Sequence, residues 1–515
     1  MTRLFVGHKP GVGGVVKVMR NDGDDPLITS NYDYGKFLFN SETGKVGYVD
    51  YFQSARFEGS IAPDTDNFFP AGTGWADCHK HIGMFTTLQY QAIFPSRILG
   101  LGDQSIVYEY REKKALGSQI TGPQVRYVQS SAGVYVIGKN VSLGPTRMWA
   151  VKRVSGRFTA GEFPACIGGK IGGDFSYIDD VYESGQQPVL CTILNLPADS
   201  TPIPASPVGA PGSRNTILIP SLVRIAKAGA SADGPGEGII IDSTKVPMKI
   251  VRAGDVNIPA SSSVDLISPV ALNENSFMDW MCWETGGSAF VPQAATTVAG
   301  YIDDYRLKMD YTIYGDRVRV FNNGPVGITV RYMICHDDGL PQTGGGSQVF
   351  RRLADGNIQI KRPGSSDTAP SSRDILLDTR FAYLPIVAEG FVDHSQFAAD
   401  GSEPRIGTHS LTVNFPNDGS YRPFLKYYVM RGDGSNISSP IFEMLRTEPV
   451  TWAEGYPSSR SSCALVTDTS VKFWMSRGNA DGARNSGDGD VEATHDDFMR
   501  VYGYRYYVFA IPTSL

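Results

Sequence analysis

The densest group of metal-capable side chains in the sequence is Asp77-Cys-His-Lys-His81. In an extended strand His79 and His81 would project to one face and Cys78 to the other, which gives two ligands on one side. A zinc site needs at least three protein ligands, and the remaining histidines, at 8, 336, 394, 409 and 495, have no partner spacing. We interpret His79 and His81 as surface or interface residues, and we expect neither a metal nor a cofactor.

Oxygen-rich segments pose the same question for calcium. Residues 479–492 and His495-Asp-Asp497 crowd carboxylates, but Gly482 comes too early for an EF-hand and no glutamate stands at the required offset. We interpret both segments, and Asn21-Asp-Gly-Asp-Asp25, as solvated acidic loops.

The glycine-rich stretch 7–14 invites comparison with a phosphate-binding loop. Such a loop continues with Lys-Ser/Thr into a helix, whereas Val15-Val-Lys-Val18 has the alternation of a strand. The sequence therefore gives no nucleotide site here, and we expect a mobile N-terminal arm.

Hydrolytic chemistry has little support. The chain has no Gly-x-Ser-x-Gly and no cysteine in a setting that would activate it. Carboxylate pairs for glycosidic cleavage arise by chance among 53 acidic residues. The candidates are Asp279, Glu284, Asp303 and Asp304, near Trp280 and Trp283. We expect these tryptophans to lie in a core or an interface, and we predict that the protein is not an enzyme.

Charge and hydropathy argue against two further classes, nucleic-acid-binding proteins and membrane proteins. The 515 residues carry 47 basic and 53 acidic side chains, a net charge of −6, with no basic run to meet a nucleic acid. No stretch approaches the roughly 18 apolar residues of a membrane helix, and the first residues lack a signal peptide's apolar core. We expect synthesis in a cytoplasm and no membrane insertion. The six cysteines are widely spaced, so we expect free thiols.

The elements that must position any site are predicted to be strands. The 57 glycines and 32 prolines break helices and supply turns, and period-two alternation recurs along the chain. We predict a mainly β protein, with helices only near Arg111–Leu116 and Ser347–Ala354. The second would be stopped by Asp355-Gly356.

Hairpin patterns recur three times, each followed by an aromatic and β-branched closing strand. They span residues 135–143, 311–320 and 465–473, and Gly315-Asp316 supplies turn chemistry in the second. We interpret them as three β-sandwich-like modules joined by Gly/Pro-rich loops, at 1–155, 156–340 and 341–515.

A second similarity supports repetition. Val16–Arg20 followed by Lys36–Ser41 parallels Ile358–Arg362 followed by Asp374–Thr379. The middle module shows no clear copy of this pattern by sequence.

Three Gly/Pro-rich segments lie between the patterned regions. Residues 339–347 have the composition of a linker, so limited proteolysis should release a folded C-terminal fragment that begins near 340–350. Residues 197–212 and 228–238 cannot pack as strands, and we expect such loops to contact partners.

Four short sequence segments resemble segments of a known class of proteins. They are Arg3–Gly11, Lys36–Ser41, Asp374–Ile386 and Tyr421–Tyr428. In style and in these phrases the chain resembles minor tail and other virion structural proteins of tailed bacteriophages. The resemblance implies a non-enzymatic β building block of a virion. Its expected place on the particle is near the tail, the tail tip or the fibre attachment. It implies a homo-oligomer whose partners are copies of itself and other tail or neck proteins.

Two other readings stay open. One is a glycan-binding or polysaccharide-depolymerising tail fibre or spike protein, with a host surface glycan as partner, although spikes usually carry short-period β-helix repeats that are absent here. The other is a head decoration or collar protein, which would share the same sequence features.

Overall fold

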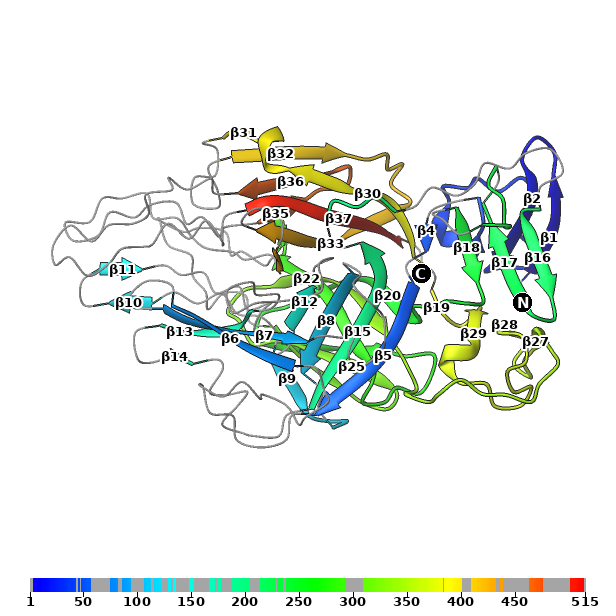
Figure 1. Cartoon of the computed structure of the whole chain (residues 1–515), viewed down its shortest axis with the longest axis horizontal. Coiled ribbons are helices and arrows are strands. Elements are labelled where there is room, and N and C mark those ends of the chain that lie inside the picture. Colours follow the sequence, from blue (N-terminus) through cyan, green and yellow to red (C-terminus); the bar gives the residue numbers. More distant parts are fainter. Residues whose placement is uncertain are drawn as a thin grey trace.

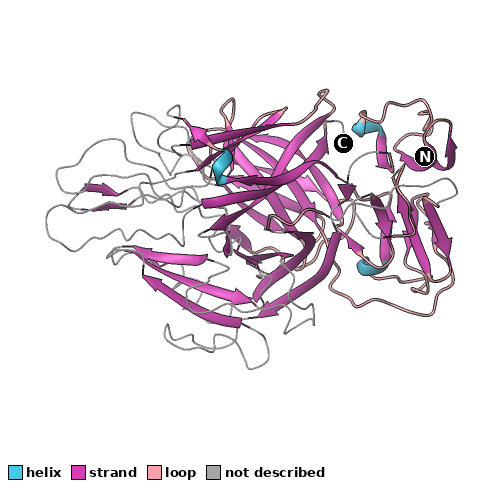
Figure 2. Cartoon of the chain, turned by 45° about the horizontal axis from the view of Figure 1, so that its top comes forward, coloured by secondary structure: helices cyan, strands magenta, loops and turns pink. Residues whose placement is uncertain are grey.

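The protein is mainly β, as predicted: the computed structural model consists of several small antiparallel sheets (Figure 2). The model describes residues 3–42, 45–46, 48–56, 75–81, 86–93, 106–112, 115–121, 128–130, 133–135, 148–151, 166–171, 175–176, 188–197, 199–203, 214–227, 229–234, 238–291, 309–382, 384–400, 409–431, 436–438, 463–475 and 501–513. For 45–56, 75–112, 120–195 and 436–438 it describes the backbone alone. No helix in these ranges is long and apolar enough to span a bilayer.

Both predicted helices are wrong. Arg111 continues strand β8 (Ile106–Glu112), and Phe350–Arg352 is strand β27, paired with β28 (Ile358–Lys361). Gly356, at φ +86°, makes the hairpin turn between β27 and β28, so the Asp355-Gly356 signal marks a turn and not a helix end. The helices among the described residues are 3₁₀ turns, η1 (Tyr34–Lys36), η3 (Ser372–Asp374) and η4 (His394–Gln396).

Three antiparallel sheets of three strands form a cap at one end of the molecule, together with the N-terminus (Figure 1). Each has its strands in chain order. The first is β1 (Arg3–Lys9), β2 (Gly13–Met19) and β3 (Phe37–Asn40); the second is β16 (Thr216–Ile219), β17 (Leu222–Ala226) and β18 (Ile239–Asp242); the third is β27, β28 and β29 (Ile375–Asp378).

The three cap sheets are copies of one unit, so the middle of the chain holds a copy that the sequence pattern alone did not reveal. In each sheet, a hydroxyl just after the third strand accepts a hydrogen bond from the backbone N–H of a residue in the middle strand. The residue that bears the hydroxyl donates its own N–H back to the same partner. The pairs are Ser41 with Val16, Ser243 with Val223 and Thr379 with Ile358, at 2.9, 3.0 and 3.0 Å from backbone nitrogen to hydroxyl oxygen.

The three cap sheets share a hydrophobic core. Val18, Ile225 and Ile360 come from the middle strands of the three sheets and pack in one cluster. Phe39, Ile241 and Leu377 join it from the third strands. Because no three-stranded sheet of this size buries its own apolar face, the three copies stabilise one another.

After each cap sheet the chain builds a sheet in the body, and three main strands of this sheet always follow the same order. In each of these sheets, the first of the three main strands along the chain lies at one side. The last lies in the middle, and the intermediate one lies at the other side. These are β5 (Tyr48–Arg56), β15 (Pro188–Pro197) and β8; β20 (Ile250–Ile258), β26 (Ile328–Cys335) and β22 (Phe277–Glu284); and β30 (Pro385–Asp393), β37 (Val501–Pro512) and β33 (Tyr421–Arg431). We call β1–β15, β16–β26 and β27–β37 repeats 1, 2 and 3.

Each repeat adds further strands that form a second sheet. Repeat 2 uses β21 (Ser262–Ile267), β24 (Met309–Ile313) and β25 (Arg317–Asn322), and repeat 3 uses β31 (Ala398–Ala399), β32 (His409–Asn414), β35 (Ala464–Val466) and β36 (Ser470–Met475). Repeat 1 has β6 (Trp75–His81), β7 (Thr86–Ile93), β13 (Cys166–Ile171) and β14 (Phe175–Ser176), with β10 (Val128–Ser130) and β11 (Gly133–Tyr135) as a separate hairpin. The hairpins predicted at 311–320 and 465–473 are confirmed as β24–β25 and β35–β36. Most of the hairpin predicted at 135–143 lies outside the described residues.

Short strands interlock the repeats in a cycle. Between cap and body, β4 (Lys45–Val46) of repeat 1 pairs with β30 of repeat 3, and β19 (Val246–Pro247) of repeat 2 pairs with β5 of repeat 1. Ala382 of repeat 3 closes the cycle by bridging Ile250 of repeat 2.

A second exchange runs the opposite way. In this direction, β9 (Gln119–Thr121) of repeat 1 pairs with β24 of repeat 2, and β23 (Ala289–Val291) of repeat 2 pairs with β35 of repeat 3. To complete it, β34 (Asn436–Ser438) of repeat 3 lies against β12 (Met148–Val151) of repeat 1. One chain therefore has the connectivity of a strand-swapped trimer with pseudo-threefold symmetry.

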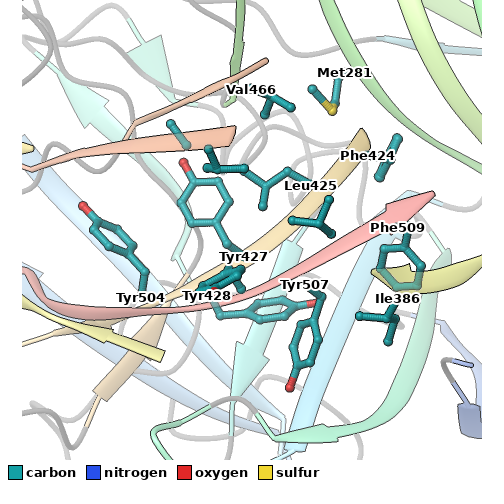
Figure 3. Close-up of a cluster of buried hydrophobic side chains, with 14 of the residues drawn as sticks. Met281, Ile386, Phe424, Leu425, Tyr427, Tyr428, Val466, Tyr504, Tyr507 and Phe509 are labelled. Carbon is teal, nitrogen blue, oxygen red and sulfur yellow. The ribbon is translucent and has the colours of Figure 1, made fainter. Parts of the chain in front are cut away.

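Repeats 2 and 3 meet in a large buried core (Figure 3). Tyr427 and Tyr504 lie edge to face there, with ring centroids 5.8 Å apart, and Met281 of β22 joins the same cluster. The buried hydroxyl of Tyr507 donates to the carbonyl of Pro197 in repeat 1 at 2.6 Å. Both faces of β26 and β37 are buried, because one packs within its repeat and the other faces the neighbouring repeats.

The strand pairs cross the predicted boundary at residue 155: β15, near residue 190, pairs with β5 and β8. Strand pairing alone does not define independently folding units. The division at 1–155, 156–340 and 341–515 stays a prediction.

Candidate functional site: an arginine-lined cleft beside strand β20

A half-open cleft of about 700 Å³ lies where the cap meets the body. Segments of all three repeats line it: the end of β2 and β3 from repeat 1, β20 and the end of β21 from repeat 2, and residues 379–382 with the start of β33 and the end of β37 from repeat 3. The cleft is thus a product of the interlocked arrangement. No single repeat contains it.

One wall of the cleft is the outer edge of β20. Five consecutive residues, 251–255, line it. Among the described strands β20 pairs with β26 alone, and its other edge carries only the single bridge at Ile250. The equivalent strands β5 and β30 are covered there by the two-residue pairs of β19 and β4. An edge strand presents unpaired backbone N–H and C=O groups that can pair with another chain.

Four arginines line the cleft, and two of them are held by carboxylates. Arg380 binds Asp378 through two hydrogen bonds, of 3.0 and 2.7 Å. Arg422 lies in looser ion pairs with Asp255 and Asp468, at 3.9 and 3.6 Å.

Arg20 and Arg252 have no carboxylate partner among the described residues. The Nε of Arg20 is buried and makes no hydrogen bond in that part of the chain, and burial lowers the pKa of the guanidinium from its ordinary value. An arginine nevertheless stays cationic near neutral pH. Arg252 donates to the Tyr332 hydroxyl at 3.2 Å and to the Ile267 carbonyl at 2.7 Å, both neutral acceptors.

Asp255, the acidic residue in the cleft lining, is neutralised from outside it. Arg331 holds both carboxylate oxygens, at 2.8 and 2.9 Å, and also donates to the Pro423 carbonyl. The cleft therefore carries a local positive charge in a protein whose net charge is negative. Guanidinium groups of this kind bind carboxylate or phosphate oxygens through paired hydrogen bonds.

A second polar cluster lies buried beneath β19. Lys249 is enclosed, donates to the Pro247 carbonyl at 2.7 Å, and has its pKa lowered to about 7 by burial, against the opposing effect of Asp337. The Ser276 hydroxyl lies 2.9 Å from Nδ1 of His336, whose pKa burial also lowers. The adjoining cavity is only about 20 Å³, room for a water molecule and not for a substrate.

The candidate carboxylates of the sequence do not form a site among the described residues. Asp279 is buried in an ion pair with Lys426, and Glu284 lies five residues further along β22, while Asp303 and Asp304 lie outside the described residues. The interpretation of the tryptophans as core residues is confirmed: Trp283 is buried beneath the Arg331 guanidinium, and Trp280 packs against the core of repeat 2.

Other candidate segments have simple outcomes. Asp77–His81 lies in strand β6, as predicted, but its side chains lie outside the described residues, as do 479–492 and 495–497. In the part of the chain with described side chains, no three His, Cys, Asp or Glu residues gather as a metal site would require. Cys282, Cys335 and Cys463 are buried, and none of them forms a disulfide bond within the described residues.

One expectation about loops is wrong, and another stays a prediction. The glycine-rich stretch 7–14 is a hairpin of the cap, β1 paired with β2, and not a mobile arm. In 228–238, Ala230 and Ala232 are buried against the second cap sheet, and the expectation that this loop contacts partners stays a prediction. Asn21–Asp25 is a surface loop, as predicted, and its Asp24 pairs with Lys36 at 3.1 Å.

Comparison with protein families, curated proteins and solved structures found no match for this chain.

Proposed function

We propose that the chain is a non-enzymatic structural component of a tailed-phage virion, associated with the tail, where it works in several copies. The proposal takes its class from the resemblance of the four sequence phrases. The observation that carries it is the cyclic strand exchange, by which three repeats of one chain hold one another like subunits of an interlocked trimer.

Such interlocking suits a virion component that must resist mechanical separation of its repeats. To separate two repeats, backbone pairs of both exchanges must break together with a shared apolar core. Dissociation of the repeats is therefore coupled to their unfolding, which slows both.

The outer strands of the cap offer surfaces for assembly. Strands β1, β16 and β27 are edge strands in their described sheets, and each bears an exposed apolar side chain: Val6, Leu218 and Phe350 are 52, 55 and 48% exposed. Apolar residues on unpaired edges mark contacts with another chain, either a further copy or a neighbouring tail or neck protein.

Labelled particles test the proposal. An antibody against this chain, applied to purified virions of the phage that encodes it, should label the tail in electron micrographs. Label on the head or collar would favour a decoration or collar protein, and absence from purified particles would overturn the proposal. Binding on a glycan array, or loss of polysaccharide viscosity on incubation, would favour the fibre or spike reading instead.

A further inference from the structure

We propose that the cleft beside β20 is a docking site for an extended acidic segment of a partner protein. The segment would add as a strand to the edge of β20 that has no partner strand in the described part of the chain, and it would set its carboxylates on Arg20 and Arg252. The identity of the partner as a neighbouring virion protein rests on the proposed function; the chemistry of the site does not.

The backbone of β20 is the first feature that favours strand addition. The cleft follows β20 over five consecutive residues and reaches both faces of its sheet, since Tyr332 lies on one face and Arg422 on the other. Gly254 lies within this run and has no side chain to hold a second backbone away. Strand addition at such an edge gives affinity through main-chain hydrogen bonds and specificity through pockets for alternate side chains.

The side chains that line the cleft are the second feature, and they favour an acidic segment with alternate apolar residues. Leu38, Ile267 and Phe381 give apolar surface for one set of alternate side chains. The guanidinium groups of Arg20 and Arg252, which no described carboxylate neutralises, attract carboxylates and repel lysine. Arg380 and Asp255 are fixed by partners of their own, so they shape the cleft without neutralising it.

These two features together favour a peptide over other anions. Inorganic phosphate or an acidic sugar would satisfy the arginines but leave the N–H and C=O groups along β20 unpaired. An acidic strand satisfies both.

The test is an array of random octapeptides probed with the purified full chain. We expect acidic peptides with apolar residues at alternate positions to be selected. A selected peptide should bind at least tenfold more weakly to the variant carrying Arg20→Gln and Arg252→Gln, and its binding should weaken in 0.5 M salt. Arg319→Gln is the matched control, because Arg319 pairs with Asp265 on β21 outside the cleft and should leave binding unchanged.

Hydrogen exchange locates the peptide. Binding should slow exchange of the β20 amides, and a proline placed at alternate positions of the peptide should abolish binding. Should the double variant fail to fold, Arg252→Gln alone carries the test, since its side chain makes hydrogen bonds to neutral groups only. Selection of the same peptides by the arginine variants, selection without acidic residues, equal competition by phosphate or trigalacturonate, or unchanged exchange in β20 would each overturn the proposal. Since this assay needs no particle, its failure leaves the virion proposal standing, and antibody labelling can fail while peptide binding holds.

Discussion

Replacing Lys426 by methionine should lower the free energy of unfolding by about 3–5 kcal/mol, because the change leaves the Asp279 carboxylate buried without its cation. Lys426 lies on β33 of repeat 3 and Asp279 on β22 of repeat 2, with side chains 1 and 2% exposed. The pair therefore joins two repeats inside their common core. Chemical denaturation of the purified variant measures the change.

The double variant distinguishes a buried charge from a lost contact. Adding Asp279→Leu to Lys426→Met removes both charges and should recover most of the loss, since buried ion pairs are replaceable by apolar residues of similar size. Arg319→Met provides the surface control: its partner Asp265 is one-third exposed, and little change is expected. A Lys426→Met variant as stable as the wild type would contradict the buried pair between repeats.

Stability should also rise with pH above neutrality on account of Lys249. Its pKa is lowered to about 7 in the folded protein by burial, from 10.5, the ordinary lysine value that the unfolded chain should have. Between these values the unfolded chain binds more protons, so raising the pH favours the folded state. The contribution approaches about 1.4 kcal/mol for each pH unit.

Lys249→Met isolates this contribution. The difference in unfolding free energy between wild type and variant should grow in favour of the wild type from pH 7.5 to pH 9. The buried Cys282 thiol, whose pKa is raised by burial, is present in both proteins, and its effect cancels in the difference. Parallel pH profiles of the two proteins would show that Lys249 is not buried as a near-neutral amine.

Local patterns predicted the hairpins well and the repeat only partly. Gly315-Asp316 and the alternation around it lie within one hairpin, so neighbouring residues suffice to specify β24–β25. The middle cap sheet was missed because the residues that it shares with the other two sheets are few and scattered: Val223 matches Val16, Ile225 matches Ile360 and Asp242 matches Asp378. The available signal was the step from an apolar residue to Asn or Asp and then Ser or Thr at the end of the third strand, as in Ile241-Asp242-Ser243.

The cleft could not be predicted from the sequence. Arg20 and Arg252 are 232 residues apart in number, and they line one surface only because the cap of repeat 1 sits against the body of repeat 2. The helix expected at Ser347–Ala354 failed for a related reason. Pairing with Ile358–Lys361 through the Gly356 turn outweighs the weak helical preference of these residues.

Cutting the chain between its repeats tests the interlocked arrangement most directly. Specific protease sites would be placed in the Pro/Gly-rich stretch 204–212, between repeats 1 and 2, and between Gly344 and Gly345, which are exposed and lie between repeats 2 and 3. After complete cleavage, the three fragments should elute together at the size of the intact chain and separate only in denaturant. Release of a folded fragment under native conditions, such as the C-terminal fragment from 340–350 that the sequence alone led us to expect, would contradict the interlocked arrangement and favour independent modules.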